Sequence, residues 1–238
     1  MKNCEFRFFP NDEEVARAAA KSWIDLAGSL PQNHTVALSG GRIATIFYDA
    51  VVEEARRRKT GLNQVHFFWA DERCVPPNDP ESNFRLANDH LFQPLATPLD
   101  HIHRLRGEWD GRKSCEAANA EIRRVISAST VGLPALDLVI LGVGPDGHTA
   151  SLMPDGPEAV VTSGEPYVYV ETAAKFPPRR ITLTYAALAA ARHVWALVTG
   201  AGKEQALRES LLPGARTPFG RVLESRPATE IFSSVPLS

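Results

Sequence analysis

Residues 136–148 read LDLVILGVGPDGH, an almost wholly apolar run followed at once by a glycine-rich turn that ends on His148. A run such as Leu136 to Leu141 is typical of a strand that is buried on both faces. Strands of this kind belong to parallel sheets, in which helices cover both sides. The turn after the strand carries Asp146 and His148, so the same stretch indicates both the fold class and a candidate catalytic residue.

Strand-like and helix-like segments alternate on both sides of this run. The apolar pattern predicts strands at 34–38, 65–69, 167–170, 181–184, 194–199 and 231–233. It predicts helices at 11–26, 43–57, 82–91, 115–128 and 203–211. This alternation indicates the α/β class: a three-layer αβα fold with a mainly parallel, Rossmann-like sheet and helices on both faces. No long linker interrupts it, so we expect one domain over residues 1–238.

Composition excludes several classes of protein. The 238 residues carry a net charge of -2 with both signs mixed, and without a basic block we expect no nucleic-acid partner. No segment approaches the roughly 18 apolar residues of a membrane span, and the first residues lack a signal-peptide pattern. The three cysteines, Cys4, Cys74 and Cys115, show no disulfide or zinc spacing. A cytoplasmic protein is the expectation.

Four polar clusters follow predicted strands. They are Ser39-Gly40-Gly41, Asp71-Glu72-Arg73, Asp146-Gly147-His148 and the segment 200–203. In open α/β sheets, ligands bind beyond the carboxyl ends of the strands. We therefore expect the four clusters to form one active site.

Two of the clusters suit a phosphate group. Ser39-Gly40-Gly41-Arg42 lies between a strand and a helix, where glycines allow close approach and free N–H groups face an anion. Lys203 starts a helix, where a cation is unfavourable unless an anion lies between it and the helix. The alternatives are a tight turn that requires positive φ and a solvated surface lysine.

The other two clusters suit acid–base chemistry. A histidine exchanges protons near neutral pH, and Asp146 is placed to orient the imidazole of His148. The alternative is a histidine that only caps a turn. In Asp71-Glu72-Arg73, we expect Arg73 to face a ligand and one of the two carboxylates to be structural; the alternative is an internal salt bridge.

Three further patterns are discounted. Gly142 to Gly147 matches GxGxxG, but Pro154 and Pro157 follow too soon for the long helix of a dinucleotide site. Cys74 has no adjacent histidine to activate it. His101 and His103 have a spacing that suits a metal, but Arg104 and Arg106 disfavour a cation there. We expect neither a metal nor an organic cofactor.

Taken in order, these motifs resemble the 6-phosphogluconolactonase family over nearly the whole chain. The most specific stretch is Gly142 to Pro154. It is supported by Ser39-Gly40-Gly41, by Asp71 to Pro76 with Glu81-Ser82-Asn83, by Arg180 to Thr184 and by 200–203.

The resemblance implies a fold similar to glucosamine-6-phosphate deaminase and ribose-5-phosphate isomerase. It implies a carboxylic ester hydrolase (EC 3.1.1.31) that converts 6-phospho-D-glucono-1,5-lactone into 6-phosphogluconate in the oxidative pentose phosphate pathway, without metal or cofactor. It assigns the general base to His148, a substrate contact to Arg73 and phosphate recognition to Arg180 and Lys203. Many members have Ser-Gly-Gly-Ser-Thr-Pro where this chain has Arg42-Ile43-Ala44 after the glycines, so Arg42 is a departure.

Two alternatives remain. An amino-sugar-phosphate isomerase or deaminase of the same fold is similar in Asp-Gly-His, but continues Ile-Ala-Phe-Asn-Glu and has Tyr where Arg73 stands. A non-catalytic sugar-phosphate regulator would keep the phosphate residues and could lose the base. Asp146 and His148 favour the hydrolase, whose partner is then a phosphorylated sugar lactone. We expect a monomer or small homo-oligomer.

Overall fold

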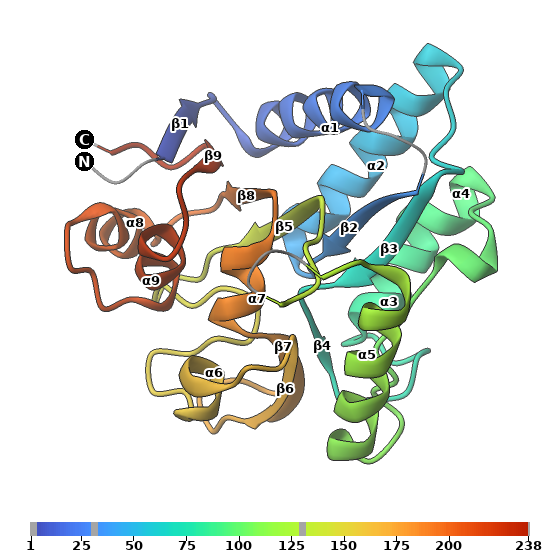
Figure 1. Ribbon diagram of the computed structural model, residues 1–238. Coiled ribbons are helices and arrows are strands. Elements are labelled where there is room, and N and C mark those ends of the chain that lie inside the picture. The colour runs from blue at the N-terminus through green and yellow to red at the C-terminus, as the bar shows by residue number, and fades with distance from the viewer. Residues whose placement is uncertain (1–3, 30–32, 129–131, 238) are drawn as a thin grey trace.

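A six-stranded sheet in the order β1-β9-β8-β5-β2-β3 forms the centre of the computed structural model, which describes residues 4–29, 33–128 and 132–237 (Figure 1). Each neighbouring pair of strands is parallel. The strands are β1 Cys4–Phe8, β2 His34–Leu38, β3 Val65–Trp69, β5 Leu138–Gly142, β8 His193–Val198 and β9 Thr229–Ser233. Every residue of β2 is buried, as a strand covered on both faces requires.

Helices cover both faces of this sheet. Trp195 of β8 belongs to the core on the side of the first two helices, whereas the next residue, Ala196, belongs to the core on the other side. Successive strand residues point to opposite faces, so at β8 the larger and the smaller core lie on opposite sides of the sheet. The first side carries α1 Asp12–Ser29 and α2 Arg42–Arg58, and the second carries α8 Glu204–Leu211 and α9 Pro218–Glu224. The predicted three-layer α/β fold is confirmed.

A second, three-stranded antiparallel sheet was not predicted. It has the order β4-β7-β6, with β4 Asp71–Arg73, β6 Tyr167–Glu171 and β7 Arg179–Leu183. The strands predicted at 167–170 and 181–184 are present, but they pair with each other in this antiparallel sheet and not with the parallel one. Only residues 172–178 connect β6 to β7, whereas a parallel connection requires a crossover of about a dozen residues. One core cluster contains residues of both sheets.

Side-chain caps fix the helix starts. The Asn11 carboxamide accepts from Glu14 N at 2.9 Å, which agrees with the predicted start of α1. Asp110 accepts from Lys113 N at 3.1 Å, so α5 Gly111–Val125 begins four residues before the predicted Cys115. Ser82 caps α3 Asn83–Ala87, which continues as the π-helical turn η1 Asn88–Phe92 and α4 Gln93–Leu95.

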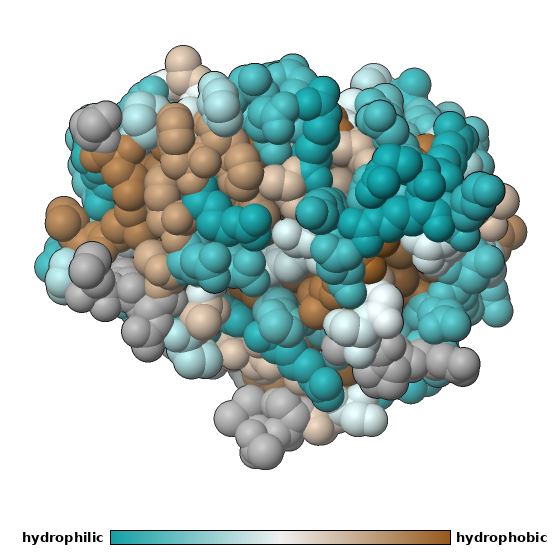
Figure 2. Space-filling view, turned by 90° about the horizontal axis from the view of Figure 1, so that it is seen from above, coloured by the Kyte–Doolittle hydropathy of each residue, from teal (hydrophilic) through white to brown (hydrophobic). Residues whose placement is uncertain are grey.

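The prediction missed several elements at the periphery. They are β1, the 3₁₀ turn η2 Leu99–His101, α6 Ala159–Thr162, α7 Tyr185–Ala190 and α9. β1 lies at an edge of the sheet, so its residues are only partly buried and its pattern is weak. Figure 2 shows apolar residues on the left of the molecule, where β1 lies, and hydrophilic residues on the right, near α2 and α4. Phe8, 57% exposed, ends β1.

The strand order creates a crevice at the centre of the sheet. From β2, the chain passes to β3 on one side and later returns to β5 on the other side of β2. Loops that follow adjacent strands diverge where the strand order reverses in this way, and such points are the usual ligand sites of doubly wound sheets. The loops after β2 and β5 carry Ser39-Gly40-Gly41 and Asp146-Gly147-His148.

Candidate active site

A cavity of about 280 Å³ lies at the carboxyl ends of β8, β5 and β2, beside β4. Nine residues that the sequence analysis placed in its clusters or assigned to the substrate line it: Ser39, Gly40, Gly41, Arg42, Asp71, Arg73, His148, Arg180 and Lys203. Asp146, which is not among the lining residues, contacts the imidazole of His148. Residues separated by up to about 160 positions in the sequence therefore share one cavity, as the parallel sheet predicts.

The imidazole of His148 is held by one carboxylate. Its Nδ1 makes a short hydrogen bond to Asp146 Oδ1, and its backbone N–H donates to the same oxygen at 3.2 Å. Among the residues that the structure describes, Nε2 has no hydrogen-bond partner. A carboxylate beside Nδ1 keeps the ring proton on that nitrogen, so Nε2 is the atom that can accept a proton. The His148 side chain is 23% exposed.

A lysine that the sequence did not single out completes this pair. Lys175 Nζ lies 3.3 Å from the second oxygen of Asp146. Burial raises the pKa of Asp146, but the hydrogen bonds and charge of His148 and the charge of Lys175 outweigh burial and bring that pKa to about 2. Asp146 is therefore ionised at neutral pH. Lys175 lies in the irregular loop 172–178, where no pattern predicts its place.

The backbone of the loop allows this close arrangement. A Cβ at Gly144 would stand 2.1 Å from both Nδ1 and Cε1 of His148, so a side chain at this position would displace the ring. Gly147 has φ of 75°, which favours glycine. The next helix after the loop, α6, begins only at Ala159, so no long helix follows the GxGxxG match within the described part of the chain.

The Ser-Gly-Gly loop brings backbone N–H groups to the cavity. Gly41, with φ of 93°, is the N-cap of α2, and the first N–H groups of a helix have no partner within it. A Cβ at Gly40 would stand 1.8 Å from Asn83 Oδ1, so the loop approaches the start of α3 closely. The Ser39 hydroxyl is used within the sheet and donates to the Ile140 carbonyl at 2.7 Å.

Arg42 and Lys203 form one positive group at the cavity. Arg42 makes a close ion pair with Asp12, yet its side chain is 63% exposed. Burial lowers the pKa of Lys203, the charge of Arg42 lowers it further and the charge of Asp12 raises it. Lys203 is the N-cap residue of α8, where the helix dipole also favours an anion. This group is suited to bind a phosphate.

Arg73 and Arg180 form a second positive group on the small antiparallel sheet, in paired positions of β4 and β7. Arg180 is buried; its Nε donates to the Pro177 carbonyl at 2.9 Å, and its Nη1 lies 4.0 Å from Asp71 Oδ2. Arg73 Nη1 donates to the Glu81 carbonyl at 2.5 Å. The Nε of Arg73 is buried without a partner among the described residues.

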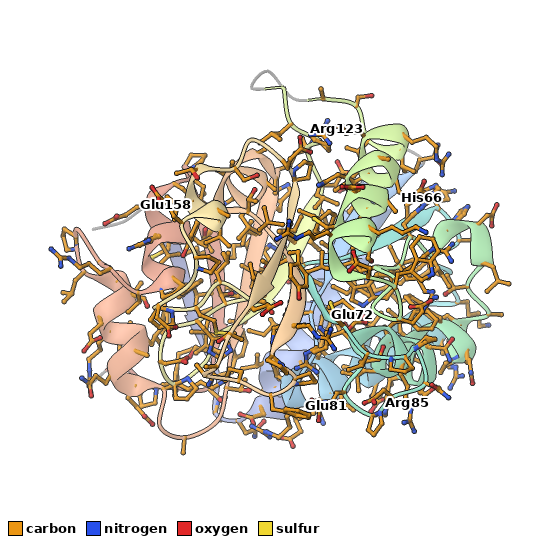
Figure 3. All side chains as sticks on the ribbon, turned by 90° about the horizontal axis from the view of Figure 1, so that it is seen from below. His66, Glu72, Glu81, Arg85, Arg123 and Glu158 are labelled. Carbon is orange, nitrogen blue, oxygen red and sulfur yellow. The ribbon has the colours of Figure 1, made fainter. Side chains whose placement is uncertain are left out.

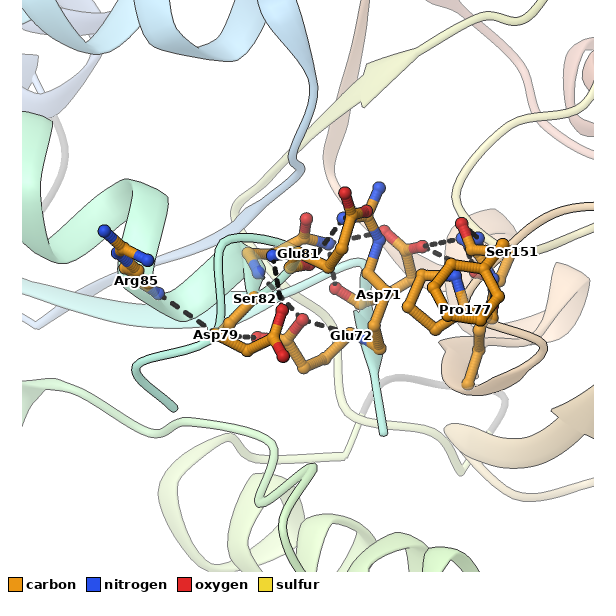
Figure 4. A network of polar contacts seen from close by, with 12 residues as sticks. Asp71, Glu72, Asp79, Glu81, Ser82, Arg85, Ser151 and Pro177 are labelled. Carbon is orange, nitrogen blue, oxygen red and sulfur yellow. Dashed lines mark hydrogen bonds and ion pairs between the residues drawn. The ribbon is translucent and has the colours of Figure 1, made fainter. Parts of the chain in front are cut away.

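The two carboxylates before Arg73 have different roles. Strand alternation turns Asp71 and Arg73 to the cavity and Glu72 away from it. Glu72 accepts hydrogen bonds from the backbone N–H groups of Arg73, Asn83 and Phe84 at 2.7 to 2.8 Å (Figure 4). Burial raises the pKa of Glu72 to about 7, against the effect of these donors. Glu72 is thus the structural residue of the pair, and Asp71 the one at the cavity.

Asn83 is a cavity residue that the predicted set omitted. Its carboxamide donates to the Asp71 carbonyl at 2.9 Å, and Asp71 Oδ2 accepts from the Ser151 hydroxyl at 2.6 Å. These contacts tie the start of α3, strand β4 and the loop after β5 together (Figure 4). The signal was available in Glu81-Ser82-Asn83, where Ser82 caps a helix and thereby places Asn83 at its first turn.

The cysteine and the two histidines that the sequence analysis discounted lie outside the cavity lining. Burial raises the pKa of Cys74 to about 11, so this cysteine is not an activated thiol. His101 and His103 stack with His66 instead. Over residues 4–29, 33–128 and 132–237, no group of three or more His, Cys, Asp or Glu residues is arranged to hold a metal ion.

Within the same ranges, none of the helices combines the length and the apolar composition of a membrane-spanning helix.

Comparison with known proteins gives one consistent family. Residues 10–231 match the family described as glucosamine-6-phosphate isomerases/6-phosphogluconolactonase. A Mycobacterium tuberculosis protein named 6-phosphogluconolactonase is 35% identical over 85% of this chain and 84% of its own length. The rice protein "Probable 6-phosphogluconolactonase 3, chloroplastic" is 32% identical over 85% of this chain. The aligned part spans 64% of that rice protein.

Solved structures show the same fold. A 6-phosphogluconolactonase from Thermotoga maritima is 27% identical, with a TM-score of 0.81 over 98% of this chain and 99% of that one. A monomeric glucosamine-6-phosphate deaminase is 18% identical, with a TM-score of 0.79 over 96% and 97% of the two chains. The predicted similarity of fold to the deaminases is confirmed.

Proposed function

The chain belongs to the family of glucosamine-6-phosphate isomerases and 6-phosphogluconolactonases, and on this basis we propose that it hydrolyses 6-phospho-D-glucono-1,5-lactone to 6-phosphogluconate (EC 3.1.1.31). One observation carries the proposal within the family. A carboxylate-held imidazole with a free Nε2 shares a cavity with two groups of cations. Arg73 in place of the tyrosine expected of the deaminases, and Thr149-Ala150-Ser151-Leu152 after His148, favour the lactonase.

The phosphate is assigned to the Arg42 and Lys203 side of the cavity. The exposed guanidinium of Arg42, the ammonium of Lys203 and the N–H groups of Gly40 and Gly41 together supply charge and directed donors. Arg180 adds a buried positive charge on the facing sheet. Anchoring the phosphate fixes the ring, and a fixed geometry removes much of the entropic cost of the reaction.

The reaction then needs one base. Nε2 of neutral His148 takes a proton from a water molecule while the water oxygen attacks the lactone carbonyl carbon. The resulting imidazolium gives this proton to the ring oxygen as the carbon–oxygen bond breaks. The new carboxyl group loses its proton to solvent, so each turnover releases one proton. Ionised Asp146 keeps the proton of Nδ1 in place and stabilises the imidazolium.

The developing oxyanion needs donors that are already in position. The guanidinium of Arg73 supplies such donors, because its side chain lines the cavity and its Nε has no partner among the described residues. One preorganised donor contributes about 3 kcal/mol to transition-state stabilisation. The bond from Arg73 Nη1 to the Glu81 carbonyl holds the guanidinium in its orientation.

A His148→Asn variant tests the central assignment. Asparagine keeps a polar group of similar reach but cannot accept a proton at neutral pH, so we expect the single-turnover rate to fall ~10²- to 10⁴-fold. Proton release from freshly generated lactone measures the rate, with phosphate-free gluconolactone as the control for phosphate recognition. A His148→Asn enzyme that retained the full rate would exclude His148 as the base.

The remaining expectations are also proposals. We also predict a single domain over residues 1–238, a monomer or small homo-oligomer, and a cytoplasmic location. We predict activity without a metal, a cofactor or nucleic acid. Activity after treatment with a chelator and sedimentation of the purified chain test the chemical and oligomeric parts.

A further inference from the structure

A second cavity, of about 510 Å³, has no lining residue in common with the catalytic cavity. It is enclosed by α5, the segment 99–109 and the start of α3, with Phe68 of β3 and Tyr167 of β6 in its wall. Figure 3 shows Glu72 between α5 and the segment that carries Glu81 and Arg85. A volume of 300–1,000 Å³ is typical of sites for small organic molecules.

The wall of this cavity is largely apolar. Phe84, Ile102, Leu105 and Ala118 contribute side chains to it, and the hydroxyl of Tyr167 is already bonded to the Trp69 carbonyl at 2.8 Å. An apolar body of ring size would be removed from water here, at about 25 cal/mol per Å² of apolar surface. The body of the ligand is therefore apolar.

The polar groups of the wall leave a surplus of positive charge. Glu121 is paired with Arg124 at 2.7 Å and with His103 at 2.7 Å, and Arg104 is paired with Glu108. Arg106 is exposed and has no ion pair or hydrogen bond from its side chain among the described residues. An unpaired guanidinium beside neutralised carboxylates favours an anion.

Two further features mark the site as built for a ligand. The guanidinium of Arg106 stacks on the ring of Trp109, 4.6 Å from its centroid, and Trp109 is 39% exposed. The Ser114 hydroxyl, on the cavity wall, is buried and has no partner in the described part of the chain. A buried unpaired hydroxyl is uncommon and costs stability, which a ligand acceptor would restore.

We propose that this cavity is a second ligand site, which binds a small molecule with an apolar, ring-sized body and one anionic group. The body fills the space between α5 and the segment 99–109, and the anionic group pairs with Arg106 at the mouth. This site does not depend on the proposed lactonase activity, because the two cavities have different lining residues.

Two probes test the proposal on the full chain. One is 1-anilinonaphthalene-8-sulfonate, which has two ring systems and one negative charge; the other is its neutral counterpart, N-phenyl-1-naphthylamine. We expect saturable binding of the anionic probe with one site per chain. Arg106→Gln should weaken that binding about five- to tenfold and leave the affinity of the neutral probe unchanged. Arg112→Gln, an exposed arginine of α5 outside the cavity, is the matched control.

A cavity-filling pair locates the site. Ala117 lines the cavity and is half-buried, so Ala117→Phe should fill part of it and weaken both probes at least tenfold. Ala120→Phe adds the same ring on an exposed position of the same helix and should change neither affinity. Unsaturable binding, or equal affinities for the wild type, Arg106→Gln and Ala117→Phe, would overturn the proposal. Circular dichroism and the melting temperature verify that each variant is folded.

Discussion

Gly144→Ala adds one methyl group beside the proposed base. The new Cβ would stand 2.1 Å from Nδ1 and Cε1 of His148 and 2.7 Å from Asp146 Oδ1, whereas ordinary contacts begin at 3.4 Å. The imidazole must therefore retreat by about 3.4 - 2.1 = 1.3 Å. Because φ of Gly144 is not in the left-handed region, alanine brings no backbone strain. The perturbation is confined to the histidine and its carboxylate.

The expected loss follows from this displacement. A shift of about 1 Å in a catalytic group costs on the order of 100-fold in rate, or about 2.7 kcal/mol of transition-state stabilisation. The ring also loses the alignment of Nδ1 with Asp146, which adds to the loss. We expect kcat to fall ~10²- to 10³-fold, with KM changed less, because the phosphate contacts are elsewhere in the cavity.

Single-turnover proton release measures the effect, and the same strand end offers a matched control. A Cβ at Gly142 would meet no atom within 4 Å, so Gly142→Ala adds the same methyl group without moving the imidazole. Its kcat should stay within about twofold of wild type. In a double variant with His148→Asn, Gly144→Ala should cost little more, because both changes remove the same interaction.

Two results would refute this reasoning. A crystal structure of Gly144→Ala with a displaced His148 ring and a wild-type rate would show that the reaction does not depend on Nε2. Equal losses in Gly142→Ala and Gly144→Ala would show that bulk in the loop, and not the position of the imidazole, limits the rate. The melting temperatures separate either outcome from misfolding.

Three other changes have expected outcomes. Burial lowers the pKa of His34 to about 4, so this histidine stays neutral in the folded chain while it takes up a proton in the unfolded chain below about pH 6.5. The free energy of unfolding should therefore fall by up to about 3 kcal/mol as the pH drops from 6.5 to 4. Urea unfolding should show a weaker pH dependence in His34→Gln. Arg42→Ser should raise KM about three- to tenfold at constant kcat, and change stability by less than about 1 kcal/mol because the Arg42 side of its pair with Asp12 is 63% exposed. An unchanged KM in steady-state assays would remove Arg42 from the phosphate site. Glu72→Gln should lower the free energy of unfolding by about 1–3 kcal/mol, because it replaces one of the two accepting oxygens by an N–H₂ group that cannot accept from a backbone N–H. An unaltered melting curve would contradict the capping role of Glu72.

The parallel sheet was predictable because its strands carry a strong signal. His34–Leu38 and Val65–Trp69 begin and end where the apolar pattern places them, since strands covered on both faces need apolar residues at nearly every position. The antiparallel sheet carries no comparable signal. In β4, three charged residues form the strand, and its pairing with β7 depends on the fold as a whole.

The cavity lining followed from the fold, but the partners of its residues did not. Parallel strands deliver their carboxyl ends to one edge, so residues after β2, β5 and β8 had to meet. Lys175 beside Asp146 and Asp12 beside Arg42 come from loops and helix ends whose positions depend on tertiary contacts. Sequence patterns report burial and periodicity, and neither property specifies which exposed charges become neighbours.

The positions of the charges explain how one fold can separate binding from proton transfer. Asp12 beside Arg42, and Asp71 beside Arg180, offset part of the positive charge at the two cationic groups, while Asp146 is committed to His148. An unbalanced cationic cavity would oppose the imidazolium that forms during the reaction. A carboxylate with a pKa of about 2 stays ionised in the reaction's pH range and offsets that repulsion where it acts. The proposed chemistry thus requires the Asp146–His148 contact as much as it requires the imidazole itself.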